Sequence, residues 1–247
     1  MLKKAIRQIL EDSRPYGWVL EPDAKRILKL SGIPVPAGRV VQSARQAVAA
    51  AKKLGFPVVA KAVGITLIHK SDAGAVILPI GDESQLEQAY HRLTGIKGCQ
   101  AVLVEAMGRG LELIVGGKID AQFGPVVLLG MGGTGVEIYH DTALRMAPLK
   151  RRDVDSMIKC LRARDLLNGF RGSRPVNREA LVELMLNFSK LLVKMADKVE
   201  SIDLNPVLCN PDGCLAADAR IILDAGYAAG TDKPEPDTGG KRPSSRA

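Results

Sequence analysis

The stretch from Ser43 to Met107 switches repeatedly between helical and strand periodicity, and this restricts the fold more than any other feature of the chain. "SARQAVAAAKKLG" repeats apolar residues at helical spacing, and Ser43 and Gln46 have capping-box spacing. "FPVVAKAV" and "GAVILPI" are typical of strands, "DESQLEQAYHRL" of a helix capped by Asp82, and "QAVLVEAM" of another strand. The order strand, strand, helix, strand indicates an α/β (α+β) chain with mostly antiparallel hairpins.

The remaining elements extend this pattern to both ends of the chain. Helices are predicted within residues 1–17, in "EPDAKRILKLSGIPVPAG", at 153–168 and at 177–198. Strands are predicted in "LELIVGGKI" and "GPVVLLG", and "SIDLNPVL" is expected to pair with "CLAADARIIL" across the turn "CNPDG". From about Ala225, a Gly-, Pro- and Ser-rich composition predicts a disordered tail.

Composition narrows the classes of partner. The chain has 247 residues and a formal net charge of +8, which favours polyanionic partners such as nucleotides and coenzyme A. The basic residues are scattered and aromatic residues are 4%, a pattern that argues against nucleic-acid binding. Apolar runs are shorter than the roughly 18 residues of a membrane span, and no signal-peptide core develops. We therefore expect a cytoplasmic protein with no membrane partner.

The segment "GITLIHKSDAGAV" holds the most reactive-looking histidine of the sequence. It places His69 beside Lys70 and Asp72, between two apolar runs and between Gly64 and Gly74. An imidazole on such a turn is able to be a solvated loop residue, a metal ligand or a nucleophile presented to a phosphate. The residue types alone leave these three interpretations open.

Lys61 interrupts the apolar strand "VVAKAV". Because a buried ammonium without a partner is costly, a polyphosphate is an attractive counter-charge for it. The alternative interpretation is a lysine on an edge strand that points to solvent.

Other candidates for nucleotide binding lie around the predicted lobe junction. The chain has neither of the common phosphate loops, because "GMGGTG" leads into a predicted strand rather than a helix. Glu105 and Glu112 bracket "AMGRG", where backbone groups such as those of Met107 could bind an adenine edge and a carboxylate could bind ribose hydroxyls. Arg145 is a further candidate cation.

A metal site is suggested near the C-terminal end of the predicted body. Asn205, in "DLNP", and Asp218 could converge from paired strands and supply hard oxygen ligands to a nucleotide-bound Mg²⁺. Asp203 lies two residues from Asn205, so it shares the same strand face. The competing interpretation is that Asn205 only ends a strand and that Asp218 only forms a surface ion pair with Arg220.

In this order, these motifs resemble the ATP-grasp domain of the NDP-forming acyl-CoA synthetases, particularly the beta subunit of ADP-forming acetate–CoA ligase. The resemblance rests on "GFPVVAKAVGITLIHKSDAGAV", "VLVEAMGRGLELIVGGKIDAQFGPVVLLGMGGTGVEIYHD", "RMAPL", "LLNGFRG" and "SIDLNPVL" with "AADARIIL". It implies an ATP-grasp fold over residues 16–224, with lobes of roughly 25–104 and 105–224 that hold a nucleotide between them. A helical extension, 1–15, precedes this domain, and the tail 225–247 follows it.

The resemblance also implies a role for each matching residue. Lys61 is expected to bind nucleotide phosphates, and His69 to accept a phosphoryl group while Lys70 and Asp72 orient it. The implied Mg²⁺ site is formed by the late oxygen ligands Asp203, Asn205 and Asp218, of which Asp203 could instead orient the imidazole.

The activity that the resemblance implies is that of a carbon–sulfur-bond-forming ligase with ATP or ADP as substrate. Together with a CoA-binding alpha subunit, the chain would catalyse acyl-CoA + ADP + phosphate ⇌ carboxylic acid + ATP + CoA. Two alternatives stay open. One is a beta subunit of the succinate–CoA ligase type, and the other is a non-catalytic nucleotide-sensing module that partners an acetyltransferase.

Overall fold

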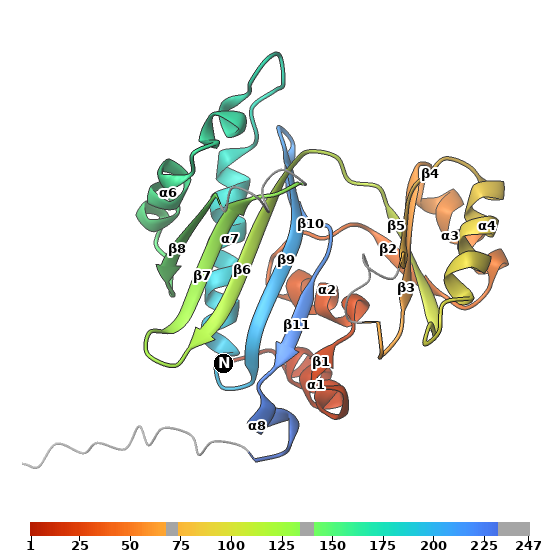
Figure 1. Cartoon of the computed structure of the whole chain (residues 1–247), viewed down its shortest axis with the longest axis horizontal. Helices are drawn as coiled ribbons and strands as arrows, with labels where there is room; N and C mark the ends of the chain where they lie inside the picture. The colour runs from red at the N-terminus through yellow and green to blue at the C-terminus, as the bar shows by residue number, and fades with distance from the viewer. Residues whose placement is uncertain (68–73, 134–140, 232–247) are drawn as a thin grey trace, which may run out of the picture.

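The computed structural model describes residues 1–67, 74–133 and 141–231, and it has two lobes, each built on one sheet (Figure 1). The larger lobe contains a seven-stranded sheet and the smaller lobe a four-stranded sheet. Every strand pair in these ranges is antiparallel, which confirms the hairpin pattern predicted from sequence.

The small lobe follows the predicted order of elements closely. Its sheet has the order β2-β5-β3-β4, with bounds Gly38–Val41, Ala101–Ala106, Val58–Val63 and Val76–Ile80. Helices α3 (Ala44–Leu54) and α4 (Glu83–Thr94) pack on it and share its core. Ser43 and Asp82 cap these helices as predicted, because their side chains accept hydrogen bonds from the amides of Gln46 and Gln85.

The large lobe contains the two ends of the described chain. Its sheet has the order β1-β11-β9-β6-β7-β8, and β10 also pairs with β9. In chain order its strands are β1 (Trp18–Val19), β6 (Leu111–Asp120), β7 (Gly124–Met131), β8 (Thr142–Met146), β9 (Val199–Asn210), β10 (Gly213–Ala216) and β11 (Arg220–Leu223). Its helices are α1 (Lys4–Ser13), η1 (Arg14–Tyr16), α2 (Glu21–Leu30), α6 (Arg151–Cys160), η2 (Arg164–Asn168), α7 (Arg178–Lys194) and α8 (Ala225–Ala228).

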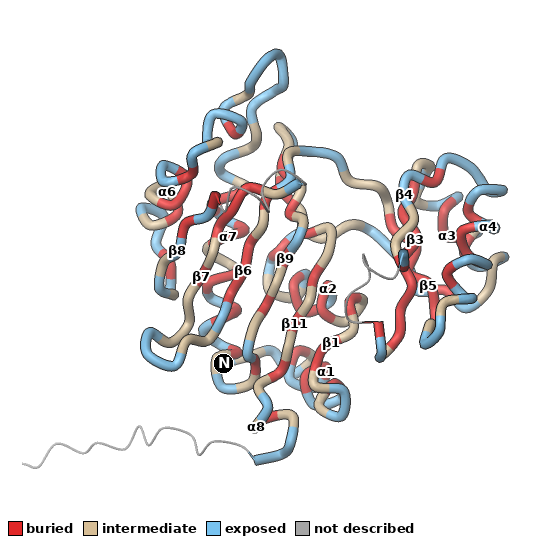
Figure 2. Tube along the Cα trace, in the orientation of Figure 1, coloured by how far each residue is buried: buried red, intermediate tan, exposed pale blue. Residues whose placement is uncertain are grey.

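Helices cover one face of the large sheet. A β-carbon added to Gly117 on β6 would lie 2.8 Å from a methyl carbon of Leu192, so glycine lets α7 approach the sheet closely. The opposite face, which we call the open face, carries Asp203 on β9 in register with Gly116 and Leu128. Figure 2 shows buried residues along the central strands of the large sheet and along β3 and β5.

One predicted helix is shorter in the structure than in the sequence analysis. The helix expected at 153–168 ends at Cys160 as α6, and a separate 3₁₀ turn, η2, follows. The break is held by Asp141, whose buried carboxylate accepts hydrogen bonds from the amides of Arg162 and Ala163 at 2.7 and 2.9 Å. Because Asp141 is 21 residues from Arg162, local periodicity could not reveal this break.

The predicted C-terminal strand "CLAADARIIL" is also divided. It forms β10 and β11, which pair antiparallel with two successive parts of β9. The interruption, at Ala217–Ala219, lies where the chain meets Lys61 of the small lobe, since the carbonyl of Ala217 accepts a hydrogen bond from the Lys61 ammonium. The break therefore belongs to the junction between the lobes.

The domain bounds in the structure differ from those expected. The boundary placed near residue 25 falls inside α2, whose Ile27 and Leu28 are buried in the large-lobe core, so the small lobe begins at β2. Residues 225–231, predicted to be disordered, include α8, which Asp224 caps and whose Tyr227 is buried. Residues 232–247 of the predicted tail lie outside the described residues.

Candidate functional site

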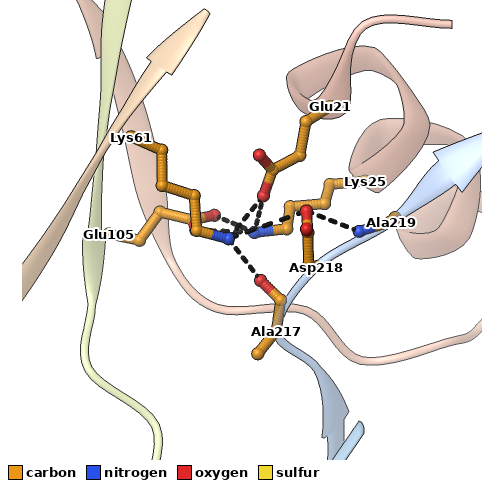
Figure 3. A network of polar contacts seen from close by, with 7 residues as sticks. All are labelled: Glu21, Lys25, Lys61, Glu105, Ala217, Asp218 and Ala219. Carbon is orange, nitrogen blue, oxygen red and sulfur yellow. Dashed lines mark hydrogen bonds and ion pairs between the residues drawn. The ribbon is translucent and has the colours of Figure 1, made fainter. Parts of the chain in front are cut away.

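Lys61 lies inside the small sheet, because β3 is flanked by β5 and β4. Its side chain is 7% exposed, so the interpretation of a solvent-pointing edge lysine is wrong. The ammonium donates hydrogen bonds to Glu21 Oε1 at 2.6 Å and to the carbonyl of Ala217 at 2.7 Å (Figure 3). The buried ammonium therefore has counter-charges from the protein itself.

Lys25, on α2, is the second ammonium of the same cluster. It donates to both carboxylate oxygens of Glu105 at 2.6 Å, and its Nζ lies 2.8 Å from Glu21 Oε1. Lys61 Nζ also lies 3.4 Å from Glu105 Oε2. These four residues, Glu21, Lys25, Lys61 and Glu105, form a closed alternation of charges that we call the charge ring.

The charge ring is buried and joins α2 of the large lobe to β3 and β5 of the small lobe. None of its four residues is more than 6% exposed. Glu21 and Lys25 are one helical turn apart on α2, and the register of β3 with β5 puts Lys61 and Glu105 on the same face of the small sheet. A β-carbon on Gly38 would lie 2.7 Å from Glu105 Cγ, so glycine on β2 leaves room for this carboxylate.

Burial and charge act differently on the two lysines. Burial opposes the charge of Lys61, but the carboxylates of Glu21, Asp218 and Glu105 together outweigh it and raise the pKa of this ammonium. Burial is also the largest influence on Lys25, and with the like charge of Lys61 it lowers the pKa of Lys25. Lys61 is therefore a fixed positive charge at neutral pH.

Asp218 lies between the charge ring and solvent. Its carboxylate is 3.8 Å from Lys61 Nζ, and its side chain is 38% exposed. On β10, Ala216 pairs with Val207, and on β11, Arg220 pairs with Asp203. Both pairs follow the same register, so Asp218 lies across from Asn205. The structure thus brings Lys61, Asn205 and Asp218 to one place at the lobe junction.

The donor chemistry at this place fits Mg²⁺. Asn205 and Asp218 offer only oxygen ligands, which Mg²⁺ prefers, and Mg²⁺ usually keeps several waters and phosphate oxygens beside one or two protein ligands. Asp203 accepts a hydrogen bond from Arg220 at 2.9 Å on the open face. Within the described ranges, no three His, Cys, Asp or Glu side chains gather as a metal site by themselves.

Glu112 and Met107 flank the connection between β5 and β6. Glu112 is exposed, and a β-carbon on Gly132 would come within 2.8 Å of its backbone, so the glycine-rich run passes directly beside it. The amide of Met107 donates to the carbonyl of Pro57 at 3.4 Å. Neither side chain hydrogen-bonds the charge ring in the described part of the chain.

Arg145 does not join the other candidates. It pairs with Val127, which is fully buried in the core beneath the helices, so it lies on the helix-covered face of the large sheet. Its guanidinium donates to Ser156 Oγ of α6 at 2.7 Å. The structure therefore gives Arg145 a packing partner on the face opposite Asp203, in place of the nucleotide contact expected from sequence.

Comparison with known proteins identifies the family of the chain. A family model described as an ATP-grasp domain matches residues 11–223. The chain belongs to the ATP-grasp family. It is 37% identical over 228 residues to the beta subunit of acetate–CoA ligase [ADP-forming] I from Pyrococcus furiosus, and the match covers 88% of this chain and 97% of that protein.

Solved structures of another relative are similar over nearly the same length. These are structures of the dinucleotide-forming acetyl-coenzyme A synthetase 1 of Ca. Korarchaeum cryptofilum. One, with coenzyme A and Mg-AMPPCP and its phosphohistidine segment pointing towards the nucleotide binding site, is 37% identical with a TM-score of 0.78. Another, with coenzyme A, acetyl-coenzyme A and a phosphorylated phosphohistidine segment, is 34% identical with a TM-score of 0.79. Each match covers 89% of this chain and 100% of that one.

The expected phosphoryl acceptor of this ATP-grasp chain, His69, lies outside the described residues, together with Lys70 and Asp72. The chain on both sides is held in place. The Trp18 indole of the large lobe donates to the carbonyl of Ile65 at 3.0 Å, and the amide of Ala62 donates to the carbonyl of Ala75 at 2.8 Å.

Sequence reasoning missed Glu21 and Lys25. Four residues apart near a helix start, they have the spacing of an ordinary exposed ion pair. The available signal was their position among apolar residues, since Ala24 and Leu28 adjoin Lys25 on the buried side of α2. A buried stripe that contains a lysine and a glutamate needs partners of opposite charge from other segments of the chain. Here these partners are Glu105 for Lys25 and Lys61 for Glu21.

Proposed function

We propose that this chain is the nucleotide-binding beta subunit of an ADP-forming acyl-CoA synthetase. With a CoA-binding alpha subunit in the cytoplasm, it catalyses acyl-CoA + ADP + phosphate ⇌ carboxylic acid + ATP + CoA. The observation that carries the proposal is the meeting of a buried ammonium, Lys61, with the oxygen ligands Asn205 and Asp218 at the lobe junction. The match over 97% of a beta subunit of this class supports it.

Each residue contributes by position and charge, which are the main demands of phosphoryl transfer. Lys61 binds nucleotide phosphate oxygens, and its raised pKa keeps it charged. Asn205 and Asp218 hold Mg²⁺, which offsets the negative charge of the phosphates. Exposed Glu112 and the backbone at Met107 are the proposed contacts for ribose hydroxyls and the adenine edge, whereas buried Glu105 balances charge.

His69 is the proposed phosphoryl carrier. Its neutral imidazole attacks the terminal phosphorus of ATP, so that a nitrogen–phosphorus bond forms as the bond to the ADP oxygen breaks. Lys70 and Asp72 orient the ring. The relative from Ca. Korarchaeum cryptofilum supports this assignment, because its phosphohistidine segment is found phosphorylated in one structure and pointing towards the nucleotide binding site in another.

Reconstitution tests the proposed function. The chain is mixed with a separately purified CoA-binding alpha-type subunit, and ATP formation is measured from acetyl-CoA, ADP and phosphate. We expect ATP only when both proteins are present, and none when the chain carries Lys61→Met. Turnover by the chain alone would show that the subunit assignment is wrong, and failure of the pure chain to bind ADP would remove the nucleotide role altogether.

A further inference from the structure

The charge ring gives each of its two carboxylates two ammonium partners. Glu21 Oε1 lies 2.6 Å from Lys61 Nζ and 2.8 Å from Lys25 Nζ. Glu105 Oε2 lies 2.6 Å from Lys25 Nζ and 3.4 Å from Lys61 Nζ. Removal of Lys61 therefore leaves Lys25 within 2.8 Å of both carboxylates, whereas removal of Lys25 leaves Glu105 with its nearest ring ammonium at 3.4 Å.

This sharing matters because Lys61 has two tasks that compete. In the structure it hydrogen-bonds Glu21, yet in the proposed function it binds a nucleotide phosphate. A lysine that leaves a buried carboxylate exposes an uncompensated charge, which is strongly unfavourable in a site as buried as Glu21, at 1% exposed. Lys25 is already within hydrogen-bond distance of the oxygen that Lys61 would leave.

We propose that Lys25 is a positioning residue for nucleotide binding, which keeps Glu21 and Glu105 neutralised while Lys61 turns to a phosphate. The inference rests on the proposed function only in taking Lys61 as a phosphate ligand. Lys25 acts through Lys61: it reduces the cost of releasing that ammonium from its protein partners. Without Lys25, a phosphate competes with the carboxylates for the same cation.

The direction in which Lys61 can turn is consistent with this role. Its ammonium also contacts the carbonyl of Ala217 and the half-exposed Asp218, which lie at the interruption between β10 and β11. That side is where Asn205 lies across from Asp218 in the sheet register. A phosphate that approaches beside the proposed Mg²⁺ ligands therefore meets Lys61 from outside the charge ring.

A double variant tests the sharing of ammonium partners separately from the net charge of the ring and from folding. Glu21→Gln with Lys25→Met removes one carboxylate and one ammonium, so the net charge of the ring is unchanged. Lys61 is then the one ammonium of the ring left beside Glu105. No second lysine of the ring neutralises Glu105 when Lys61 turns to a phosphate. The matched control is Glu21→Gln alone, in which Lys25 still neutralises Glu105 at 2.6 Å and Lys61 is free to turn.

The measurement is the dissociation constant of ADP with Mg²⁺, by titration calorimetry on the full-length chain, with the unfolding midpoint recorded for every variant. We expect Glu21→Gln to bind ADP at least as tightly as the wild type, and the double variant to bind about tenfold more weakly than Glu21→Gln. Lys25→Arg, which keeps the charge, should bind ADP more tightly than Lys25→Met.

Equal dissociation constants for Glu21→Gln and the double variant would overturn the inference, because Lys25 would then contribute to folding alone. Lys25→Arg that binds ADP as weakly as Lys25→Met, with an unchanged unfolding midpoint, would also contradict it. Wild-type chain that does not bind ADP, or Lys61→Met chain that binds it normally, would instead overturn the proposed function.

Discussion

Two sets of ion pairs in this molecule have similar distances and different surroundings. In the charge ring, Lys25 and Glu105 lie 2.6 Å apart with side chains 6% and 3% exposed. On the open face, Arg220 and Asp203 lie 2.9 Å apart with side chains 36% and 44% exposed. Because water screens the second pair and not the first, distance alone is a poor guide to what each pair contributes. The buried set is therefore tied to the fold, whereas the exposed pair contributes little to stability.

The largest effect on stability is expected from Lys25→Met. It removes the donor that contacts both oxygens of Glu105, which is 2% exposed, and leaves Lys61 at 3.4 Å as the nearest ammonium of the ring, so the free energy of unfolding should fall by about 3–5 kcal/mol. Lys61→Met should cost less, about 1–3 kcal/mol, because Lys25 still neutralises both carboxylates. Urea unfolding monitored by circular dichroism measures both values.

The control for this pair of variants is Lys25→Arg, which keeps a cation beside Glu105. Its unfolding free energy should lie closer to the wild type than that of Lys25→Met. If Lys61→Met proved the more destabilising of the two, the distances in the ring would not describe how its charges are shared.

The smallest effect is expected on the open face. Arg220→Gln breaks the exposed pair with Asp203, and the free energy of unfolding should change by less than about 1 kcal/mol. The same urea experiment measures it. A loss as large as that of Lys25→Met would mean that exposure does not separate these two sets of ion pairs.

The sequence predicted the local elements of the small lobe well. Ser43 and Asp82 act on amides three residues away, so the signals that begin α3 and α4 are contained in short stretches of sequence. Lys61 was also recognised as an ammonium that needs a counter-charge. What local reasoning could not supply was the identity of that counter-charge, since Glu21 is 40 residues from Lys61 in the chain.

Other misses have the same physical origin. Asp141 ends α6 across more than 20 residues, and Ala217 interrupts the last strand to meet a lysine of the other lobe. Arg145 was grouped with the nucleotide ligands by residue type, whereas the register of β8 places it on the helix-covered face. Contacts between segments far apart in the sequence determine the end of α6, the break in the last strand and the position of Arg145. These contacts depend on how the strands pair in the sheets.

Phosphoryl transfer through His69 is the central step of the function proposed for this ATP-grasp chain. The most direct measurement is incubation of the chain and its alpha-type partner with γ-³²P-labelled ATP and Mg²⁺, followed by mapping of the label. We predict an acid-labile, base-stable label on His69, absent from His69→Ala and strongly reduced in Asp218→Asn, whose unfolding midpoint should stay near that of the wild type. A label that persists in His69→Ala, or that maps to His91 or His140, would contradict the account.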